Sequence, residues 1–96
     1  MDRETILQEA CNCVCGNREE DYGSPEDNFQ TIANLWNAYI GWNHLQPIDV
    51  AMMMSLLKIA RIKTGRYKED SFIDLAGYAA CAGEIGGNNQ NGLDRT

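Results

Sequence analysis

Apolar residues recur along the chain at the three-and-four spacing of an amphipathic helix, and no stretch alternates as a half-buried strand does. This pattern predicts four helices joined by short polar connections. They are expected to begin after Asp2, at Ser24, at Pro47 and near Asp70, and to end near Gly16, Ile40, Gly65 and Ile85. The sequence therefore predicts an all-α, four-helix bundle-like domain.

The predicted helix starts depend on capping residues. Asp2 can cap the first helix, and Ser24 can cap the second, with Pro25 at the first helical position and Asp27 three residues after the cap. The stretch NREEDYGSPED, which leads into this start, is polar and rich in turn formers. We therefore expect a non-helical connection before Ser24.

The third predicted helix is apolar nearly all round, which is typical of a helix at the centre of a bundle. The fourth is rich in alanine and contains Gly77 and Gly83. Because glycine disfavours a helix interior, these residues indicate close contact with another helix, within the chain or across a dimer. A short chain with these two helices is expected to be completed by homo-oligomerisation.

The length and the net charge of the chain limit its domain organisation and the classes of function open to it. The 96 residues predict a single helical domain over residues 1–86 and a disordered tail over 87–96, where Leu93 is the only large apolar residue. The net charge of −6 argues against general nucleic-acid binding, although it permits one local basic pocket. No apolar run is long enough to cross a bilayer and no signal-peptide pattern is present, so we expect a cytoplasmic protein without a membrane partner.

The four cysteines are expected to be reduced thiols. Cys11, Cys13 and Cys15 form a CxCxC pattern, but three thiolates on a straight helix cannot converge on one zinc ion. We expect them, and Cys81, to act as small apolar fillers rather than as metal ligands.

Two charged pairs flank the predicted turn at Gly65. Lys58 and Arg61 share one face near the end of the third helix, and Asp70 and Asp74 share one face at the start of the fourth. If these helices form a hairpin, the two pairs face each other. Charges in apolar helices need partners or a ligand, so the cluster predicts either a binding site or an internal salt-bridge network.

The residue types in this region suit phosphate and magnesium chemistry. Lys58 and Arg61 can contact phosphate oxygens, and Asp70 and Asp74 can ligate Mg²⁺. Further carboxylates could join them if the bundle brings the start of the second helix close: Glu19, Glu20, Asp21, Glu26 and Asp27. A nucleotide base could stack on one of the aromatic residues Tyr22, Trp36, Tyr39 and Tyr78.

Residues 18–85 resemble a family of small phage and prophage proteins of unassigned function that are described as MazG-like, after the all-α nucleotide pyrophosphohydrolases. The resemblance rests on these residues: Arg18, Tyr22-Gly23, Asn28-Phe29, Lys58, Arg61, Asp70, Asp74 and Gly77-Tyr78. MazG enzymes bind Mg²⁺ through an ExxE motif on one helix and ExxD on the next. Here Asp70 and Asp74 stand in the ExxD region but four residues apart, and the preceding helix carries Lys58 and Arg61 in place of ExxE.

The resemblance implies a nucleotide site built by Lys58, Arg61, Asp70 and Asp74. It adds Arg18, Tyr22, Asn28 and Tyr78 as ligand-binding candidates. One hypothesis is a Mg²⁺-dependent nucleoside triphosphate pyrophosphohydrolase. The alternative is a non-catalytic sponge that sequesters a nucleotide or cyclic-nucleotide immune signal in phage counter-defence. The third hypothesis is a structural or interaction protein without a ligand.

Overall fold

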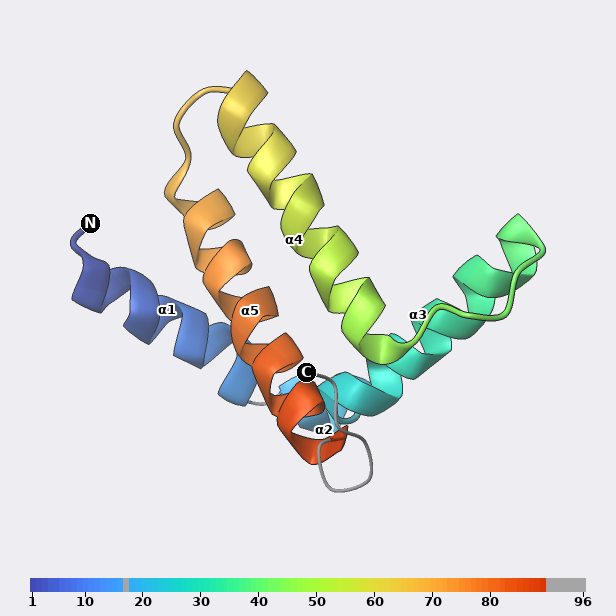
Figure 1. The fold of residues 1–96 in the computed structure, drawn as a ribbon. Coiled ribbons are helices and arrows are strands. Elements are labelled where there is room, and N and C mark those ends of the chain that lie inside the picture. The colour runs from blue at the N-terminus through green and yellow to red at the C-terminus, as the bar shows by residue number, and fades with distance from the viewer. Residues whose placement is uncertain (17, 90–96) are drawn as a thin grey trace.

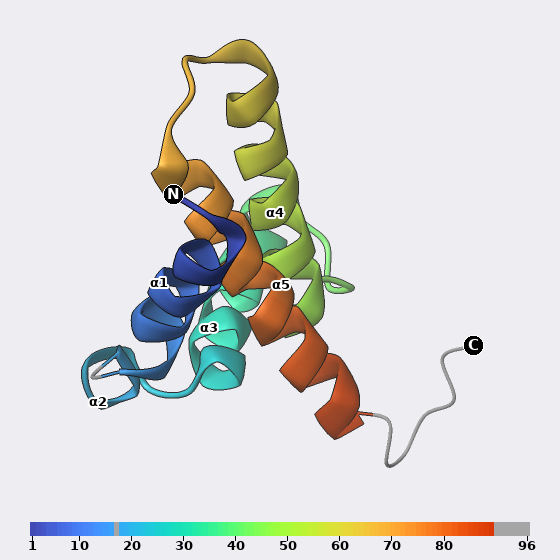
Figure 2. The same cartoon turned by 90° about the vertical axis from the view of Figure 1, so that its left-hand side faces the viewer.

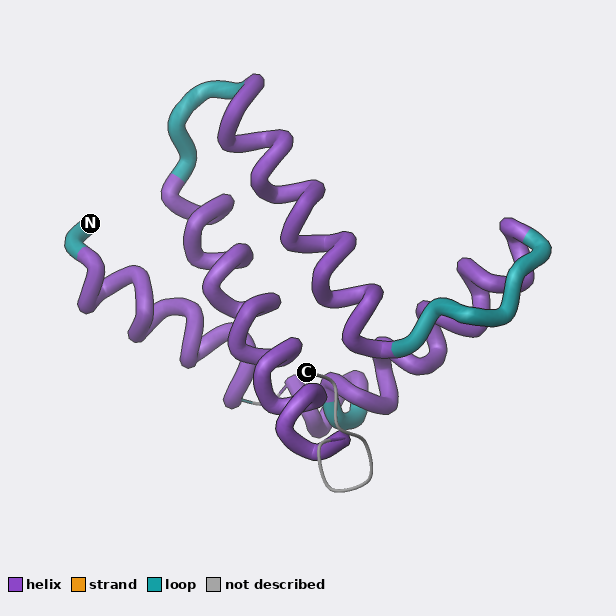
Figure 3. Tube along the Cα trace, viewed as in Figure 1, coloured by secondary structure: helices purple, strands orange, loops and turns teal. Residues whose placement is uncertain are grey.

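The computed structural model describes residues 1–16 and 18–89. It contains α1 (Arg3–Cys15), α2 (Arg18–Tyr22), α3 (Pro25–Ile40), α4 (Pro47–Thr64) and α5 (Glu69–Asn89), and no strand within the described residues. The all-α prediction is confirmed, and the four longer helices are the four expected. The non-helical connection expected before Ser24 is wrong, because residues 18–22 form a short helix. Figure 3 shows that the loop from α3 to α4 runs back beside the C-terminal half of α3, where the Asn37 side chain bonds the Leu45 backbone.

The predicted caps are formed. The Thr5 amide donates to Asp2 Oδ1 at 2.8 Å, and the Asp27 amide donates to Ser24 Oγ at 3.1 Å. Each bond satisfies an amide that has no partner within its own helix. The bond from Thr5 also lowers the pKa of the Asp2 carboxyl. Because the folded pKa lies below the unfolded one, this stabilisation is complete above the unfolded pKa and is lost as pH falls through the folded pKa.

The centre of the arrangement is α5 (Figures 1 and 2). α4 runs antiparallel along one side of α5, α1 packs against another side, and α3 packs against both α4 and α5. From the region near the start of α4, the C-terminal half of α3 and the whole of α4 diverge as the two arms of a V (Figure 1). One face of α4 is therefore left without a neighbouring helix.

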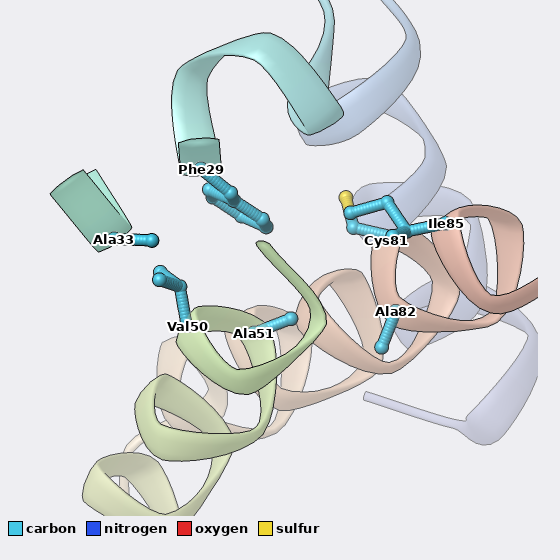
Figure 4. Close-up of a cluster of buried hydrophobic side chains, with 7 residues drawn as sticks. All are labelled: Phe29, Ala33, Val50, Ala51, Cys81, Ala82 and Ile85. Carbon is cyan, nitrogen blue, oxygen red and sulfur yellow. The ribbon is translucent and has the colours of Figure 1, made fainter. Parts of the chain in front are cut away.

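The described core is a small cluster between α3, α4 and α5 (Figure 4). Its buried members are Phe29, Ala33, Val50, Ala51, Cys81, Ala82 and Ile85. The alanines at this junction let the helix backbones approach closely, and Ile85 and Val50 are the largest fully buried side chains. Loss of volume from either would leave a cavity, because close-packed interiors relax only partly.

The expectation that the third helix would be the central one is wrong for the single chain. Only Pro47, Val50, Ala51 and Ser55 of α4 are buried, whereas Leu56 is 64% exposed. The sequence pattern is apolar on all sides, but α5 and α3 cover only part of the helix circumference. The central position belongs to α5.

The small residues of α5 have two different environments. Gly77 is buried, and a Cβ built there would lie 3.1 Å from Val14 Cγ1, so this glycine allows α1 to pack closely against α5. The predicted close contact is confirmed at this position. Gly83 is exposed and has nothing within 4 Å of an added Cβ, so in the single chain it makes no such contact.

The expectation that the cysteines act as small apolar fillers is right for Cys81 and wrong for the other three. Cys81 is buried in the core, whereas Cys11, Cys13 and Cys15 are exposed. The reason is that α1 contributes only Ala10 as a fully buried residue and turns most of its surface to solvent.

The C-terminal end of α5 passes the predicted domain boundary. The helix continues to Asn89, so residues 87–89 of the predicted tail are helical. Residues 90–96, the rest of that predicted tail, lie outside the described residues. In the part of the chain that the structure describes, no helix is both long and apolar enough to span a membrane.

Candidate functional site

The turn between α4 and α5 brings the two predicted charged pairs together. α4 ends at Thr64, where the Gly65 amide still donates to the Arg61 carbonyl at 2.9 Å, and α5 begins at Glu69. The last turns of α4 therefore lie beside the first turns of α5. Lys58 Nζ and Asp74 Oδ2 are 2.9 Å apart across this hairpin. The predicted juxtaposition of the basic and acidic pairs is confirmed.

A cleft of about 560 Å³ opens at this end of the hairpin. All four residues of the predicted pairs line it. The complete lining consists of Lys58, Arg61, Thr64, Gly65, Arg66, Lys68, Asp70, Ser71 and Asp74. The volume is within the range of small-molecule sites.

The cleft concentrates the positive charge of an acidic chain. It is lined by four of the eight lysines and arginines in the sequence, but by only two of the fourteen aspartates and glutamates. The formal charge of its lining is therefore +2, whereas that of the whole chain is −6. This distribution favours an anionic ligand, because a cleft whose net charge has one sign attracts the opposite sign.

One ion pair does not neutralise this cleft. Lys58 is largely buried, with 14% of its side chain exposed, and Asp74 is 40% exposed. Among the described residues, Arg61, Arg66 and Lys68 form no ion pair with a carboxylate. The salt-bridge network that would join both predicted pairs is therefore not formed, and three cations remain available to a ligand.

Of the remaining predicted ligand-binding residues, Tyr78 lies further along α5, whereas Tyr22 ends α2 and Asn28 lies in α3. Tyr78 lines a cavity of about 80 Å³ together with Phe29 and Asp74, and its ring centroid is 6.3 Å from that of Phe29. Tyr22 and Asn28 line a cavity of about 20 Å³ next to Cys81, which is room for a single water molecule. None of these three residues lines the cleft at the turn between α4 and α5, which we call the basic cleft.

Tyr22 and Asn28 are thus separate from the basic cleft, whereas Asp74 lines both this cleft and the cavity of Tyr78. From Asp74 to Cys81 the helix advances by about 10 Å, so Tyr22 and Asn28 lie near the middle of α5, beyond the reach of the turn. Arg18 lies in α2, and its side chain is outside what the structure describes.

The predicted convergence of carboxylates on Asp70 and Asp74 is not found. Within the described residues, no group of three or more His, Cys, Asp or Glu side chains is placed to hold a metal ion. The reason is the topology: α2 packs against α1 and α3, and the start of α3 lies beside the second half of α5, away from the turn. The donor set at the cleft is two aspartates, one already paired with Lys58 and both among four cations, which does not suit Mg²⁺.

Sequence reasoning missed the loop between the two helices. Arg66, Tyr67 and Lys68 follow one another there, and Arg66 and Lys68 line the cleft. The Tyr67 side chain is 70% exposed, and its ring centroid lies 5.7 Å from that of Phe72. A basic–aromatic–basic run in a turn is a signal for phosphate and base recognition that the sequence already contained.

Two curated relatives come from phages. The "Gene 55 protein" of Mycobacterium phage D29 is 46% identical over 82 residues, which cover 85% of this chain and 54% of that protein. The "Gene 55 protein" of Mycobacterium phage L5 is 45% identical over 75 residues, which cover 78% and 48%. The chain therefore spans about half the length of the curated relatives it matches. No solved structure matches it.

The relatives confirm the predicted similarity to phage proteins of unassigned function, whereas the likeness to MazG enzymes stays a prediction. A family model described as a domain of unknown function matches residues 5–86, which include most of α1, all of α2 to α4, the basic cleft and most of α5. The chain belongs to this family, DUF6378.

Proposed function

We propose that the chain binds a nucleotide by its phosphates in the basic cleft and holds it without cleaving it. The observation that carries the proposal is the concentration of Lys58, Arg61, Arg66 and Lys68 around one cleft in a chain whose net charge is −6. Cations that lack carboxylate partners are costly to hold together, because like charges repel. A polyanionic ligand removes that cost.

Each cation has a distinct part in this proposal. Arg61 and Arg66 offer planar forks that bind phosphate oxygens in a bidentate way, and Lys68 adds a mobile point charge. Lys58 is held in place by Asp74. Tyr67, exposed beside the cleft, supplies a face on which a base can stack, which favours a nucleotide over inorganic phosphate.

The non-catalytic form of the hypothesis is the one that these residues support. Pyrophosphohydrolysis of the MazG type needs carboxylates that hold Mg²⁺ and activate water. The cleft offers two aspartates among four cations, and the ExxE motif is absent from α4. A chain that binds a nucleotide and lacks this machinery acts as a sponge, which lowers the free concentration of its ligand. In a phage family, a nucleotide or cyclic-nucleotide immune signal is the proposed ligand.

Retention of an intact ligand tests this proposal. The protein is incubated with nucleoside triphosphates or cyclic dinucleotides, in Mg²⁺ or in EDTA, and the ligand is chromatographed after denaturation. We expect at least one nucleotide to be depleted from solution, with or without Mg²⁺, and to be recovered unchanged. Release of pyrophosphate or of a monophosphate in Mg²⁺ would favour the hydrolase. Absence of depletion with every nucleotide would refute binding itself.

Asp74→Asn is predicted to tighten nucleotide binding by about twofold to tenfold. The change frees Lys58 and removes one negative charge from the cleft while keeping the shape of the side chain. Stability should fall by about 1–3 kcal/mol, because the largely buried Lys58 loses its ionic partner although Asp74 itself is partly exposed. Glu84→Gln, an equal charge change on an exposed part of α5 outside the cleft, is the matched control for calorimetric titration. Weaker binding in Asp74→Asn would instead indicate that the carboxylate contacts the ligand.

A further inference from the structure

The outer face of α4 is apolar and uncovered. Its exposed members are Met52, Met53, Leu56, Leu57 and Ile59, which we call the α4 apolar face. Their exposed fractions run from 40% to 64%. Residues 50–57 contain no charged side chain. The V formed by α3 and α4 leaves this face without a helix of the same chain (Figure 1).

The end of α3 enlarges the uncovered surface. Leu35, Tyr39, Ile40 and Trp42 are 51% to 94% exposed. If a fully exposed side chain of this size offers roughly 150–250 Å², the nine side chains together expose on the order of 800 Å². Monomeric proteins rarely expose contiguous apolar patches above roughly 300–600 Å², and a standard interface buries about 800 Å² per partner. The α4 apolar face supplies a little under half of this exposed area, and the end of α3 must contribute the rest for an interface of standard size.

The spacing of residues along α4 indicates which partner fits. Asp49, Met52, Leu56, Ile59 and Lys63 follow one another at intervals of three, four, three and four residues. Such a row forms a seam along one side of a helix, as in helix pairs that pack side by side. Leu56 is its midpoint, and Asp49 and Lys63 each lie seven residues from it. The seam is therefore apolar in the middle, negative at one end and positive at the other.

We propose that the α4 apolar face binds the same face of a second copy of this chain, with the two α4 helices antiparallel and the two-fold axis at Leu56. In this arrangement Asp49 of each copy lies against Lys63 of the other, and the apolar residues pack between them. A parallel pairing would place Asp49 against Asp49 and Lys63 against Lys63. The terminal charges contribute little energy but select the antiparallel direction. The pairing is isologous, so it closes at two copies.

The proposed dimer leaves the basic clefts open. Lys58 is two residues from Leu56, which places it about 200° around α4, on the side that faces α5. The proposed dimer does not depend on nucleotide binding, because the α4 apolar face and the basic cleft lie on different sides of α4.

Sedimentation equilibrium of the whole chain tests the interface. We expect twice the chain mass of 10.7 kDa at micromolar concentration. Leu56→Glu should weaken self-association by at least about tenfold, because it places two carboxylates at the centre of the apolar seam. Leu7→Glu is the matched control, since Leu7 is similarly exposed at 63% but lies on α1. A monomer at all concentrations, or equal effects of both changes, would overturn the proposal.

Disulfide trapping tests the direction of the helices. In a variant whose exposed Cys11, Cys13 and Cys15 are serine, Leu56→Cys should form a dimer on oxidation, because residue 56 meets its own copy. Met52→Cys should not, since an antiparallel pairing offsets residue 52 from its copy by about 12 Å, beyond the reach of a disulfide. Trapping of both variants would indicate a parallel pair. Trapping of neither would show that the interface lies elsewhere. Either result would refute the antiparallel seam.

Discussion

Arg61→Glu is expected to weaken nucleotide binding by at least about a hundredfold. The arginine provides charge-assisted hydrogen bonds to phosphate, each worth about 1.5–3 kcal/mol. The glutamate adds repulsion between its own charge and the ligand. Because Arg61 is exposed in α4 and forms no ion pair with any residue that the structure describes, its replacement should leave the helical content unchanged. Calorimetric titration of the two proteins with the same nucleotide measures the change.

Arg3→Glu is the matched control for this variant. It changes the net charge by the same amount, starts from the same residue type, and lies at an exposed position on α1 that does not line the cleft. The control separates local recognition from the general effect of a more acidic chain. Equal losses in both variants would show that only the overall charge matters. Unchanged binding in Arg61→Glu would place the ligand outside the cleft.

The salt dependence of binding gives a second measure of the same contacts. Ionic strength screens interactions between exposed charges, with a Debye length of about 10 Å at 0.1 M. A ligand held by several cations should therefore lose affinity as salt is added, and Arg61→Glu should flatten this dependence. An affinity insensitive to salt would favour recognition through the base and ribose instead.

The parts of the fold that depend on local sequence could be predicted. Helix starts depend on residues within one turn, such as Ser24 and Asp27, and the cap that they form confirms this. The charged cluster was predictable for the same reason: Lys58 and Asp74 belong to two helices joined by a short turn, so their approach follows from the hairpin alone. A contact between two adjacent helices of a hairpin can be predicted without knowing where the other helices lie.

The parts that depend on how non-adjacent helices pack could not be predicted. An all-round apolar pattern on α4 fits a helix at the centre of one chain and a helix at the surface between two chains equally well. The acidic residues near the start of α3 converge with Asp70 and Asp74 only if α3 reaches the turn of the hairpin, and its start lies beside the second half of α5 instead. Tyr22 and Asn28 lie apart from the cleft for the same reason.

Ile85→Ala is expected to cost about 2–5 kcal/mol of unfolding free energy. Ile85 is 1% exposed and belongs to the cluster that joins α3, α4 and α5 (Figure 4). Truncation removes three carbons from a site whose other members include Ala33, Ala51 and Ala82, which have no flexible side chain to fill the gap. The cavity therefore stays largely open. Urea unfolding followed by circular dichroism measures the loss.

The size of this loss follows from how few large side chains the core contains. A domain of this length has a total stability of about 5–15 kcal/mol, so a single core truncation removes a large share of it. Leu7→Ala is the matched control, because it also removes three carbons, at an α1 position that is 63% exposed, and it should change stability by less than about 0.5 kcal/mol. All variants are compared at one protein concentration, since self-association adds to apparent stability. If Ile85→Ala cost no more than Leu7→Ala, the junction at the end of α5 would not be the core that holds the three helices together.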